Sequence, residues 1–530
     1  MKLSSPRRRG TRAAAVTAGI ASIALLASCS VANSESEGGG EGGAGDTLRV
    51  VLTQEPPTLE ACDANLTSTG VVVRSTVTEP LVERNPSTGE LEPLLATEWE
   101  QTGDTEWTFT VRDDVTFQDG TPFDAEAAAY SIDRAVNGDL GCNVEGYIVG
   151  DDDLEVEATD ATTLTVTTPS PDPILPLKLS FIEIVSPETS NTEFVREPVG
   201  TGPYAIGEWQ AGTKLTLERN DDYWGDAPQF ADVEYQWRSE GTVRAAMITS
   251  GEADIALGLS AEDGIGDLGV SYPNNETIAL RFSGQTAPLD DIRIRQAINY
   301  AIDREGIVSS LYPDGDKVAA QLIPEGIVGF NADLEPWEYD PEKAKALVEE
   351  AAADGVAVDT KILMPVRTAQ FPKVSELGEV LREQLAAAGL NVELRMVDTT
   401  QHLQYQLSPF VTNEGPISML IQHGNQAGDA QFTVEQYMLT GGAQAEFGDP
   451  ALDELITTAR TLTGDERQAA YEEVFAYERE NVVALAPIAH QMVMLGLADR
   501  VTYEPNSSTG DELRIKEAVS YTHLTLPTKA

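Results

Sequence analysis

Apolar and polar residues alternate along short stretches in the first part of the chain, a pattern that is typical of half-buried strands. Every second position of residues 107–111 is aromatic or aliphatic, with polar residues between them. We expect a second short strand that ends at Gly120, because Asp-Gly is a strong turn pair. Asp124 then stands where the N-cap of a helix over residues 125–136 is expected. The segment predicts a strand–turn–strand–helix unit.

Residues 290–304 instead carry apolar side chains at the spacing of one helical face. The apolar positions follow one another at i, i+3, i+4, i+7 and i+8, and Asp290 precedes them as a cap. Arg293, Arg295 and Arg304 lie off this stripe. We therefore assign the three arginines to the surface or to a contact between lobes, with a basic cluster for an anionic ligand as the alternative.

Helix and strand patterns alternate in the second half of the chain. Asp340, followed by proline, opens a helix, and residues 361–366 have the composition of a strand. A striped helix over residues 377–388 ends at Gly389, and an alternating strand over residues 392–396 follows. This order predicts a right-handed crossover between two parallel strands. The other predicted elements are strands at residues 47–52, 164–166, 214–219 and 482–497, a helix and turn over 243–254, and helices after Asp449 and over 465–480.

The composition limits both the size and the partners of the folded protein. The chain has 530 residues, with 87 acidic and 35 basic side chains and a formal net charge of −52. This length exceeds that of one ordinary core, so two or more lobes are expected. The large negative charge excludes nucleic-acid binding. A solvated acidic surface explains it, and it says nothing about the charge of a ligand.

The first 46 residues have the composition of a targeting segment and a tether. Arginines precede an apolar stretch over residues 13–26 that is too short for a comfortable membrane span. It ends in Leu-Ala-Ser-Cys, which resembles the lipobox of bacterial lipoproteins, so residues 1–29 would be a signal peptide ending at lipidated Cys29. An ordinary signal peptide is the alternative. Residues 30–46 form a flexible Gly/Ser/Glu tether, whose G-x-G-x-x-G match is rejected because no strand precedes it.

The two other cysteines form a candidate disulfide. With Cys29 lipidated, Cys62 and Cys142 remain as a pair in a compartment that permits oxidation. We favour a disulfide over two free buried thiols.

The C-terminal residues 519–530 resemble the translation of a sequencing-library adapter, which is a form of cloning scar. We expect the native sequence to end near Ala518. The tail, including His523, is therefore left out of functional reasoning.

The usual catalytic motifs are absent from the sequence. It contains no G-x-S-x-G elbow, no H-E-x-x-H and no C-x-x-C. Outside the tail the histidines are His402, His423 and His490, which are far apart in sequence, whereas a dedicated metal cage has closely spaced ligands. We therefore expect no enzyme, no metal site and no cofactor.

Several sequence blocks follow one another in the order found in one protein family. Between residues 47 and 503 this order resembles the family 5 solute-binding proteins of bacterial ABC importers, the dipeptide, oligopeptide and nickel type. We assign the Gly-Thr-Gly-Pro-Tyr block at residues 200–204 to a sharp backbone reversal beside packed aromatics, not to ligand contact. The blocks are residues 94–99, 107–112 and 117–123, Pro-Val-Gly-Thr-Gly-Pro-Tyr at 198–204, Asn-Asp-Asp-Tyr-Trp-Gly at 220–225, Ser-Gly-Glu-Ala-Asp at 250–254, and 290–304.

The resemblance implies an α/β fold of two lobes, a periplasmic-binding-protein-like clamshell of the cluster C type. Lobe I would comprise residues 47–285, with an extra subdomain near 67–197, and the chain would return to it over 489–518. Lobe II would comprise residues 286–488. The ligand would be enclosed between the lobes, where closure removes water and strengthens polar contacts.

The implied function is that of the extracytoplasmic solute-binding component of an ABC importer. The protein would be a monomer, held by its lipid on the outer face of the cytoplasmic membrane. It would deliver a peptide or peptide-sized polar solute to the permease, whose cytoplasmic ATPases drive transport. A metal chelate or an oligosaccharide is the alternative ligand. A secreted enzyme, or a surface receptor or chaperone, is the alternative class.

Two segments are candidates for ligand contact. Arg367 follows a predicted lobe II strand, where open α/β sheets bind ligands, and the resemblance implies an arginine there for a peptide carboxylate. A solvated arginine is the alternative.

In the loop of residues 422–432, the aspartate that pairs with the ligand amino group in peptide-binding relatives falls on Asn425, whose amide cannot supply that charge-assisted contact. A peptide with a free N-terminus is therefore in doubt. The other candidates are Asp429, which looks structural in relatives, His423, as a cleft hydrogen-bonder or a packed loop residue, and Trp237 and Tyr147, as aromatic walls.

Overall fold

The computed structural model describes most of the chain beyond the N-terminal 46 residues. The predicted signal peptide with Cys29, the tether and residues 521–530 lie outside the described part. Within it, no helix is long and apolar enough to cross a membrane. The described residues are 47–142, 144–150, 153–312, 315–368, 370–411, 413–425, 427–506, 508 and 512–520.

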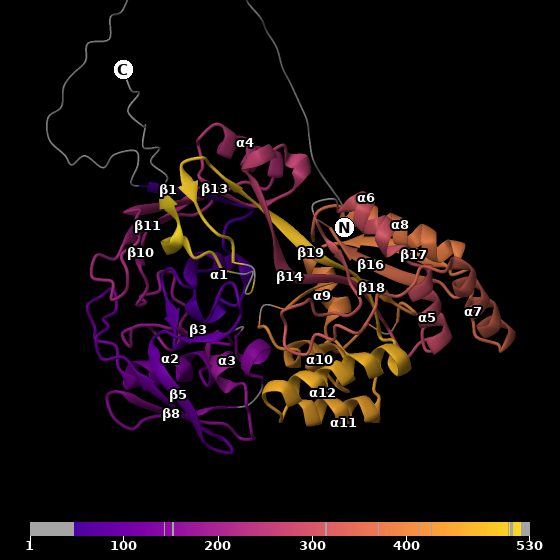
Figure 1. The fold of residues 1–530 in the computed structure, drawn as a ribbon, viewed down its shortest axis with the longest axis horizontal. Helices are drawn as coiled ribbons and strands as arrows, with labels where there is room; N and C mark the ends of the chain where they lie inside the picture. Colours follow the sequence, from indigo (N-terminus) through magenta and orange to yellow (C-terminus); the bar gives the residue numbers. More distant parts are fainter. Residues whose placement is uncertain are drawn as a thin grey trace, which may run out of the picture. The chain divides into compact units, whose positions relative to one another are not determined.

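A mixed sheet contains strands from both ends of the sequence. β1 (Thr47–Leu52) pairs in parallel with β12 (Asp232–Trp237) and with β13 (Ile255–Leu259). The long strands β14 (Gly269–Phe282) and β19 (Leu485–Leu497) run antiparallel, side by side (Figure 1). The strand order is β10 (Tyr204–Gln210), β11 (Lys214–Arg219), β12, β1, β13, β19, β14 and β18 (Ser418–Gly424), and β15 (Lys317–Val318) also pairs with β19.

The two long strands connect different hydrophobic cores. Tyr272 of β14 packs against the core that contains Leu48 and Tyr235, whereas Ile278 of the same strand lies in the core that contains Leu420. We call lobe I the part around the first core together with the core that contains Phe109, and lobe II the part around the second core together with the core that contains Tyr471. Because β14 and β19 contribute to both lobes, the boundaries expected from the sequence stay a prediction. Helices α1 (Thr67–Val73) and α4 (Gly241–Thr249) belong to lobe I.

A second, antiparallel sheet follows α1 in the sequence. Phe109 of β6 is fully buried in its core, as the alternation predicted, and helix α2 (Ala125–Val136) packs on the same core. Asp124 caps this helix, because its carboxylate accepts a hydrogen bond from the Ala127 N–H at 2.9 Å. The strand order of this sheet is β5 (Ala96–Gly103), β6 (Glu106–Val111), β8 (Thr163–Thr167) and β7 (Glu155–Ala158).

The prediction of a short strand that ends at Gly120 is wrong. A single bridge, between Thr116 and Pro122, joins this segment to itself. Gly120 adopts a φ of +83°, and its N–H donates to the Phe117 carbonyl, so the chain turns before a ladder can form.

Cys62 and Cys142 are joined by a disulfide, with their Cα atoms 5.5 Å apart. Both sulfurs lie in the core beneath α2, beside Phe109 and its neighbours. The bond links the segment after β1 to the loop after α2.

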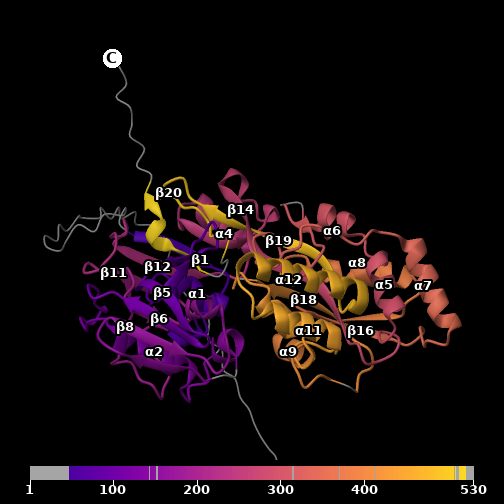
Figure 2. The same cartoon turned by 60° about the horizontal axis from the view of Figure 1, so that its bottom comes forward.

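Lobe II contains the predicted strand–helix–strand unit. β16 (Ile362–Arg367) pairs in parallel with β17 (Val392–Val397), and α8 (Val374–Ala387) connects them, which confirms the parallel pair. Gly389 follows α8 with a φ of +95°, the left-handed conformation that ends a helix. Helices α11 and α12 lie side by side (Figures 1 and 2). Other helices of this lobe are α7 (Pro341–Ala353), α9 (Thr399–Gln406), α10 (Gln431–Tyr437), α11 (Pro450–Ala459) and α12 (Gly464–Tyr477).

The helix predicted over residues 290–304 is two helices, α5 (Ile292–Ala301) and α6 (Arg304–Leu311). Its apolar stripe is buried as expected. The cap is Asp291 instead of Asp290, because the Asp291 carboxylate accepts the Arg293 N–H at 2.9 Å. A second N-cap, Asp303, starts α6.

The surface assignment of Arg295 and Arg304 is wrong, whereas Arg293 forms exposed ion pairs as expected. Arg295 is 5% exposed and Arg304 is 2% exposed. Each guanidinium is buried because backbone carbonyls accept its hydrogen bonds, some nearby and some from a distant segment of the chain. These acceptors include Leu289 and Val482 for Arg295, and Pro487 and Asn299 for Arg304.

The glycines of residues 200–204 allow close contact between two backbone segments. They do not supply unusual backbone dihedrals for a reversal. A Cβ atom at Gly200 would lie 2.3 Å from the Val77 carbonyl oxygen, and one at Gly202 would lie 2.5 Å from the Thr76 carbonyl oxygen. Neither glycine has a positive φ. The backbone of this block therefore needs glycine because it packs directly against another backbone.

The polar residues of the same blocks converge on one buried carboxylate. Glu79 accepts hydrogen bonds from Thr201 Oγ1, Tyr223 Oη and Trp224 Nε1 at 2.7–2.9 Å. Burial raises the pKa of Glu79, and these donors oppose the increase. The blocks at residues 200–204 and 220–225 thus have a structural role, as assigned.

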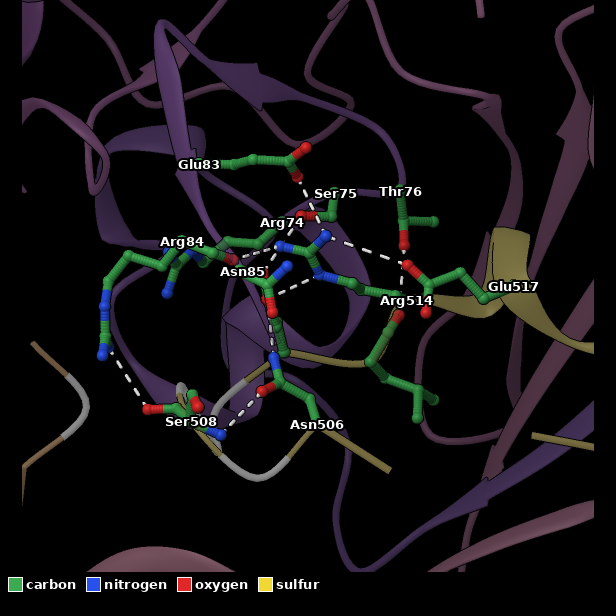
Figure 3. Close-up of polar contacts among 12 residues, drawn as sticks. Arg74, Ser75, Thr76, Glu83, Arg84, Asn85, Asn506, Ser508, Arg514 and Glu517 are labelled. Carbon is green, nitrogen blue, oxygen red and sulfur yellow. Dashed lines mark hydrogen bonds and ion pairs between the residues drawn. The ribbon is translucent and has the colours of Figure 1, made fainter. Parts of the chain in front are cut away.

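The C-terminal segment packs on lobe I through a buried arginine. Arg514 donates to Glu512 at 2.9 Å and to the Arg84 carbonyl at 2.8 Å, and it forms an ion pair with Glu83 at 2.9 Å (Figure 3). The Ser508 carbonyl accepts a hydrogen bond from Arg84 Nη1 at 3.2 Å. Further strand pairs are β2 (Glu79–Pro80) with β9 (Glu183–Ile184), β3 (Val82–Arg84) with β4 (Leu91–Pro93), and β20 (Val501–Thr502) with β21 (Val519–Ser520).

Glu478, at the end of α12, predicts a specific pH dependence. Burial raises the pKa of Glu478 to about 7, against the hydrogen bonds that it accepts from backbone N–H groups such as that of Ala484. The folded protein therefore holds this proton more tightly than the unfolded chain does. The stability from this group is complete below about pH 4.3 and is lost as the pH rises to about 7.

We expect wild-type protein to lose up to about 3 kcal/mol relative to Glu478→Gln between about pH 4.5 and pH 7.5. Urea denaturation at both pH values measures the change. Glu349→Gln, at an exposed position of α7, is the matched control and should show no such trend. A difference between Glu478→Gln and wild type that is the same at both pH values would contradict the prediction.

Candidate ligand-binding site

A cavity of about 310 Å³ lies where lobe I faces lobe II. On the lobe I side, Trp99 and Trp107 are among the residues that form an apolar wall, and on the lobe II side Gly428 and Arg467 line it. Phe432, in the first turn of α10 directly after this loop, packs into the core beneath α2. The polar loop singled out in the sequence is therefore in contact with lobe I.

Gly428 allows a close approach between this loop and lobe I. A Cβ atom at this position would lie 2.2 Å from Arg84 Nη2, and the φ of Gly428 is +77°. A side chain here would therefore be strained and would also displace the guanidinium.

His423 and Asn425 lie together in a buried network at the end of β18. His423 Nε2 is 2.7 Å from Thr433 Oγ1, and Thr433 Oγ1 lies 2.9 Å from Asn425 Oδ1. The single hydroxyl proton goes to the amide oxygen, so His423 donates from Nε2 and its tautomer is fixed. Its ring also packs edge-on against Tyr437, with centroids 4.8 Å apart, and burial lowers the pKa of His423 to about 3. This geometry is that of a packed residue, and it lies at the end of β18 instead of in a loop.

The Asn425 amide uses its hydrogen-bonding groups inside the protein. Nδ2 donates to the carbonyls of Asn275 at 3.0 Å and Leu322 at 3.2 Å, while Oδ1 accepts from Thr433. The geometry therefore gives Asn425 a structural role between β14 and the loop.

Asp429 is paired with Arg467. The guanidinium donates from Nε to Oδ2 at 2.8 Å and from Nη2 to Oδ1 at 2.7 Å. Both side chains are 3% exposed. Asp429 also accepts the Gln431 N–H at the start of α10, so its carboxylate holds the cavity wall in place.

Arg367 is the last residue of β16 and is half-buried. In the part of the chain that the structure describes, its guanidinium has no hydrogen bond and no ion pair. Desolvation lowers the pKa of Arg367, and the negative charge of Glu276 on β14 opposes this decrease. A half-desolvated cation without a fixed partner is suited to binding an anionic group.

One of the two aromatic candidates, Trp237, belongs to the lobe I core. Trp237 is the last residue of β12 and packs against the lobe I core beside Tyr235. The side chain of Tyr147 lies outside the described part of the structure.

Sequence reasoning missed residues that only strand register brings together. Glu276 lies opposite Gly424 on β18, and Thr277 lies between His423 and His490 on the two neighbouring strands. A lone acidic residue at the start of a long apolar run could have drawn attention to Glu276. No spacing rule connects it to Arg367 or to His490. Among the described residues, no group of three or more His, Cys, Asp or Glu side chains could hold a metal ion.

Comparison with known families identifies the class of the protein. The family model described as bacterial extracellular solute-binding proteins, family 5 (middle region), matches residues 90–444. The chain belongs to this family of solute-binding proteins.

Individual relatives agree with this assignment. The chain is 27% identical over 371 residues to the dipeptide-binding protein of Escherichia coli, covering 61% of this chain and 66% of that protein. It is 31% identical over 303 residues to the nickel-binding periplasmic protein of E. coli, covering 52% and 56%. The chain thus spans less than two thirds of these curated relatives.

A solved structure shows the fold. The periplasmic binding protein DppA of Helicobacter pylori, in complex with the peptide STSA, superposes with a TM-score of 0.75 at 20% identity. The superposition covers 89% of this chain and 98% of that chain. The two-lobed, periplasmic-binding-protein-like α/β fold expected from the sequence is confirmed.

Proposed function

We propose that the protein is the extracytoplasmic solute-binding component of an ABC importer and captures a peptide or a peptide-sized polar solute between its lobes. The family membership and the cavity lined by both lobes support this function. A solute that contacts both lobes at once favours the closed form by those contacts, and it leaves without any change in its bonds. Anchoring through Cys29, a monomeric state and delivery to a permease with cytoplasmic ATPases complete the proposal.

The proposal depends on the position and the environment of Arg367. It stands at the carboxyl end of β16, where the strands of an open α/β sheet present residues to ligands. Its guanidinium is half-desolvated, and the described residues give it no acceptor. A carboxylate of the solute would supply the missing charge-assisted bonds.

Replacing Arg367 by glutamine should weaken binding of a mixture of di- and tripeptides about 10–100-fold, because a hydrogen-bonded charge pair is lost. Isothermal titration calorimetry measures the change. Arg382→Gln, on the exposed face of α8, is the matched control and should bind as the wild type does. Unchanged affinity in Arg367→Gln would remove Arg367 from the site.

A metal chelate is the second candidate ligand, and the similarity to the nickel-binding protein of E. coli favours it. Because the described residues hold no cluster of metal-ligating side chains, the metal would arrive already bound by an organic chelator. An anionic chelator would also bind to Arg367. Native mass spectrometry of the purified protein distinguishes a peptide from a metal-containing adduct by mass.

A further inference from the structure

The cavity of about 310 Å³ between the lobes has apolar walls on both sides. Trp99 and Trp107 pack on the core beneath α2 and also line the cavity, so each ring has one part in the core and one part free for contact. Both side chains are half-buried. Further apolar side chains of this wall are Leu91, Ile174 and Leu177 on lobe I, and Val328 and Leu462 on lobe II.

The charged residues that line the cavity are held by bonds inside the protein. Arg467 and Asp429 pair through both carboxylate oxygens, and both are 3% exposed. Arg84 is 5% exposed and donates to the carbonyls of Gly89 at 3.1 Å and Ser508 at 3.2 Å. A charged group of a solute would lose water in the cavity and would have to compete with these bonds. The wall therefore favours a neutral, apolar occupant.

The size of the cavity suits one ring-bearing group and not a whole peptide. Sites that enclose a drug-sized ligand measure about 300–1,000 Å³, whereas a cavity of about 150 Å³ already binds benzene. This cavity lies at the lower limit of the first range. The Trp107 ring is held in place because Nε1 donates to the Asp172 carbonyl at 3.0 Å, and it can pack against a second ring without a loss of its own freedom.

The two walls of the cavity belong to different lobes. On lobe I they come from β5, β6 and the segment of α3 (Leu175–Leu179), and on lobe II from Val328 and the start of α12 (Figure 1). An apolar group in the cavity is removed from water on both sides only when the lobes are together. Its burial therefore favours the closed form over the open form.

We propose that this cavity binds an aromatic group of the solute, so that the captured solutes are peptides or peptide-sized compounds that carry an aromatic ring. The inference rests on the proposed function of solute capture and adds the chemical class of the solute. Arg367 is not among the residues that line the cavity, so the aromatic contact is separate from the proposed anionic contact.

The test compares tripeptides that differ by one aromatic ring. The first probe is an equimolar mixture of the three tripeptides that combine one phenylalanine with two alanines, and the second probe is trialanine. Calorimetric titration of the wild type should show tighter binding of the first probe by about tenfold or more, because a buried ring adds at least that much transfer free energy. Equal affinities of the wild type for the two probes would overturn the inference.

The variant Val328→Trp fills the cavity from the lobe II side. Val328 is 37% exposed, so a larger side chain there does not disturb a core. The variant should lose the preference for the phenylalanine mixture and should bind trialanine within about twofold of the wild type, since trialanine carries no ring. Val243→Trp is the matched control, because Val243 is 42% exposed on α4 and does not line the cavity. It should keep the full preference.

A Val328→Trp variant that keeps the preference would overturn the inference. The same conclusion would follow if this variant lost affinity for trialanine and for the phenylalanine mixture to the same extent, because the effect would then not concern the ring. Leu177→Asn, on the opposite wall, introduces a polar group and should also reduce the preference.

Indole alone tests the cavity without a peptide. Saturation-transfer NMR should detect indole bound to the wild type and to Val243→Trp, and not to Val328→Trp. If the wild type binds tripeptides without preference and binds no indole, the inference is overturned while peptide capture stands. If it binds indole in the expected pattern but no tripeptide, the peptide form of the proposed function is overturned while the aromatic site stands.

Discussion

Replacing Arg467 by methionine is expected to lower the free energy of unfolding by about 3–5 kcal/mol. Arg467 contacts both carboxylate oxygens of Asp429, at 2.7 and 2.8 Å, and the two side chains are 3% exposed. Methionine keeps much of the apolar length of arginine but leaves the Asp429 carboxylate buried without its cation. Urea denaturation at neutral pH measures the loss.

The matched control is Arg460→Met. Arg460 is 38% exposed and lies 3.8 Å from Glu435, so its loss should cost less than about 1 kcal/mol. The double variant Arg467→Met/Asp429→Leu removes both buried charges and should recover part of the stability. An Arg467→Met variant as stable as the wild type would show that the pair is not buried as described.

Loss of the bond between Cys62 and Cys142 is expected to lower the free energy of unfolding by about 4.5 kcal/mol on the chain-entropy account. The two cysteines are 80 residues apart in sequence, so the bond restricts a long segment of the unfolded chain. The variant Cys62→Ala/Cys142→Ala tests this by urea denaturation under oxidising conditions.

Reduced wild-type protein is the control for the altered side chains, because it keeps both sulfur atoms and lacks only the bond. It should unfold at nearly the same urea concentration as the double variant. Identical midpoints for oxidised and reduced wild type would contradict the stabilising role.

Local signals in the sequence were sufficient for several elements of the fold. Asp124 predicted the start of α2, and Gly389 predicted the end of α8. Both signals act within one turn of chain, through a cap and a left-handed residue, so no tertiary contact is needed to interpret them. The parallel pair of β16 and β17 followed because the helix between them requires a crossover.

Features that depend on distant partners could not be predicted in this way. Arg295 and Arg304 are charged and off the apolar stripe, yet carbonyls near the start of β19 accept their hydrogen bonds and allow burial. Gly200 is required by the Val77 backbone, which is more than one hundred residues away in sequence. In both cases the determining neighbour comes from another part of the chain.

The residues of the candidate site divide in the same way, into those that a local sequence signal predicts and those that depend on distant partners. Arg367 was predicted because the end of a strand is visible in the sequence, and its role as a ligand contact stays a proposal. His423, Asn425 and Asp429 were selected because they lie in a polar loop that the family resemblance places near the ligand, but each of them bonds inside the protein, with Thr433 or Arg467. Glu276 was missed because only the strand register, which the sequence does not show, places it beside the end of β18.

Native mass spectrometry tests reversible solute capture most directly. The protein is incubated with the peptide mixture and its complex is weighed, and the protein is then denatured so that the released solute can be weighed as well. We expect one solute for each chain, recovered with its mass unchanged. A recovered solute that has been cleaved or otherwise modified, or a protein that carries no solute from the mixture, would contradict peptide capture between the lobes.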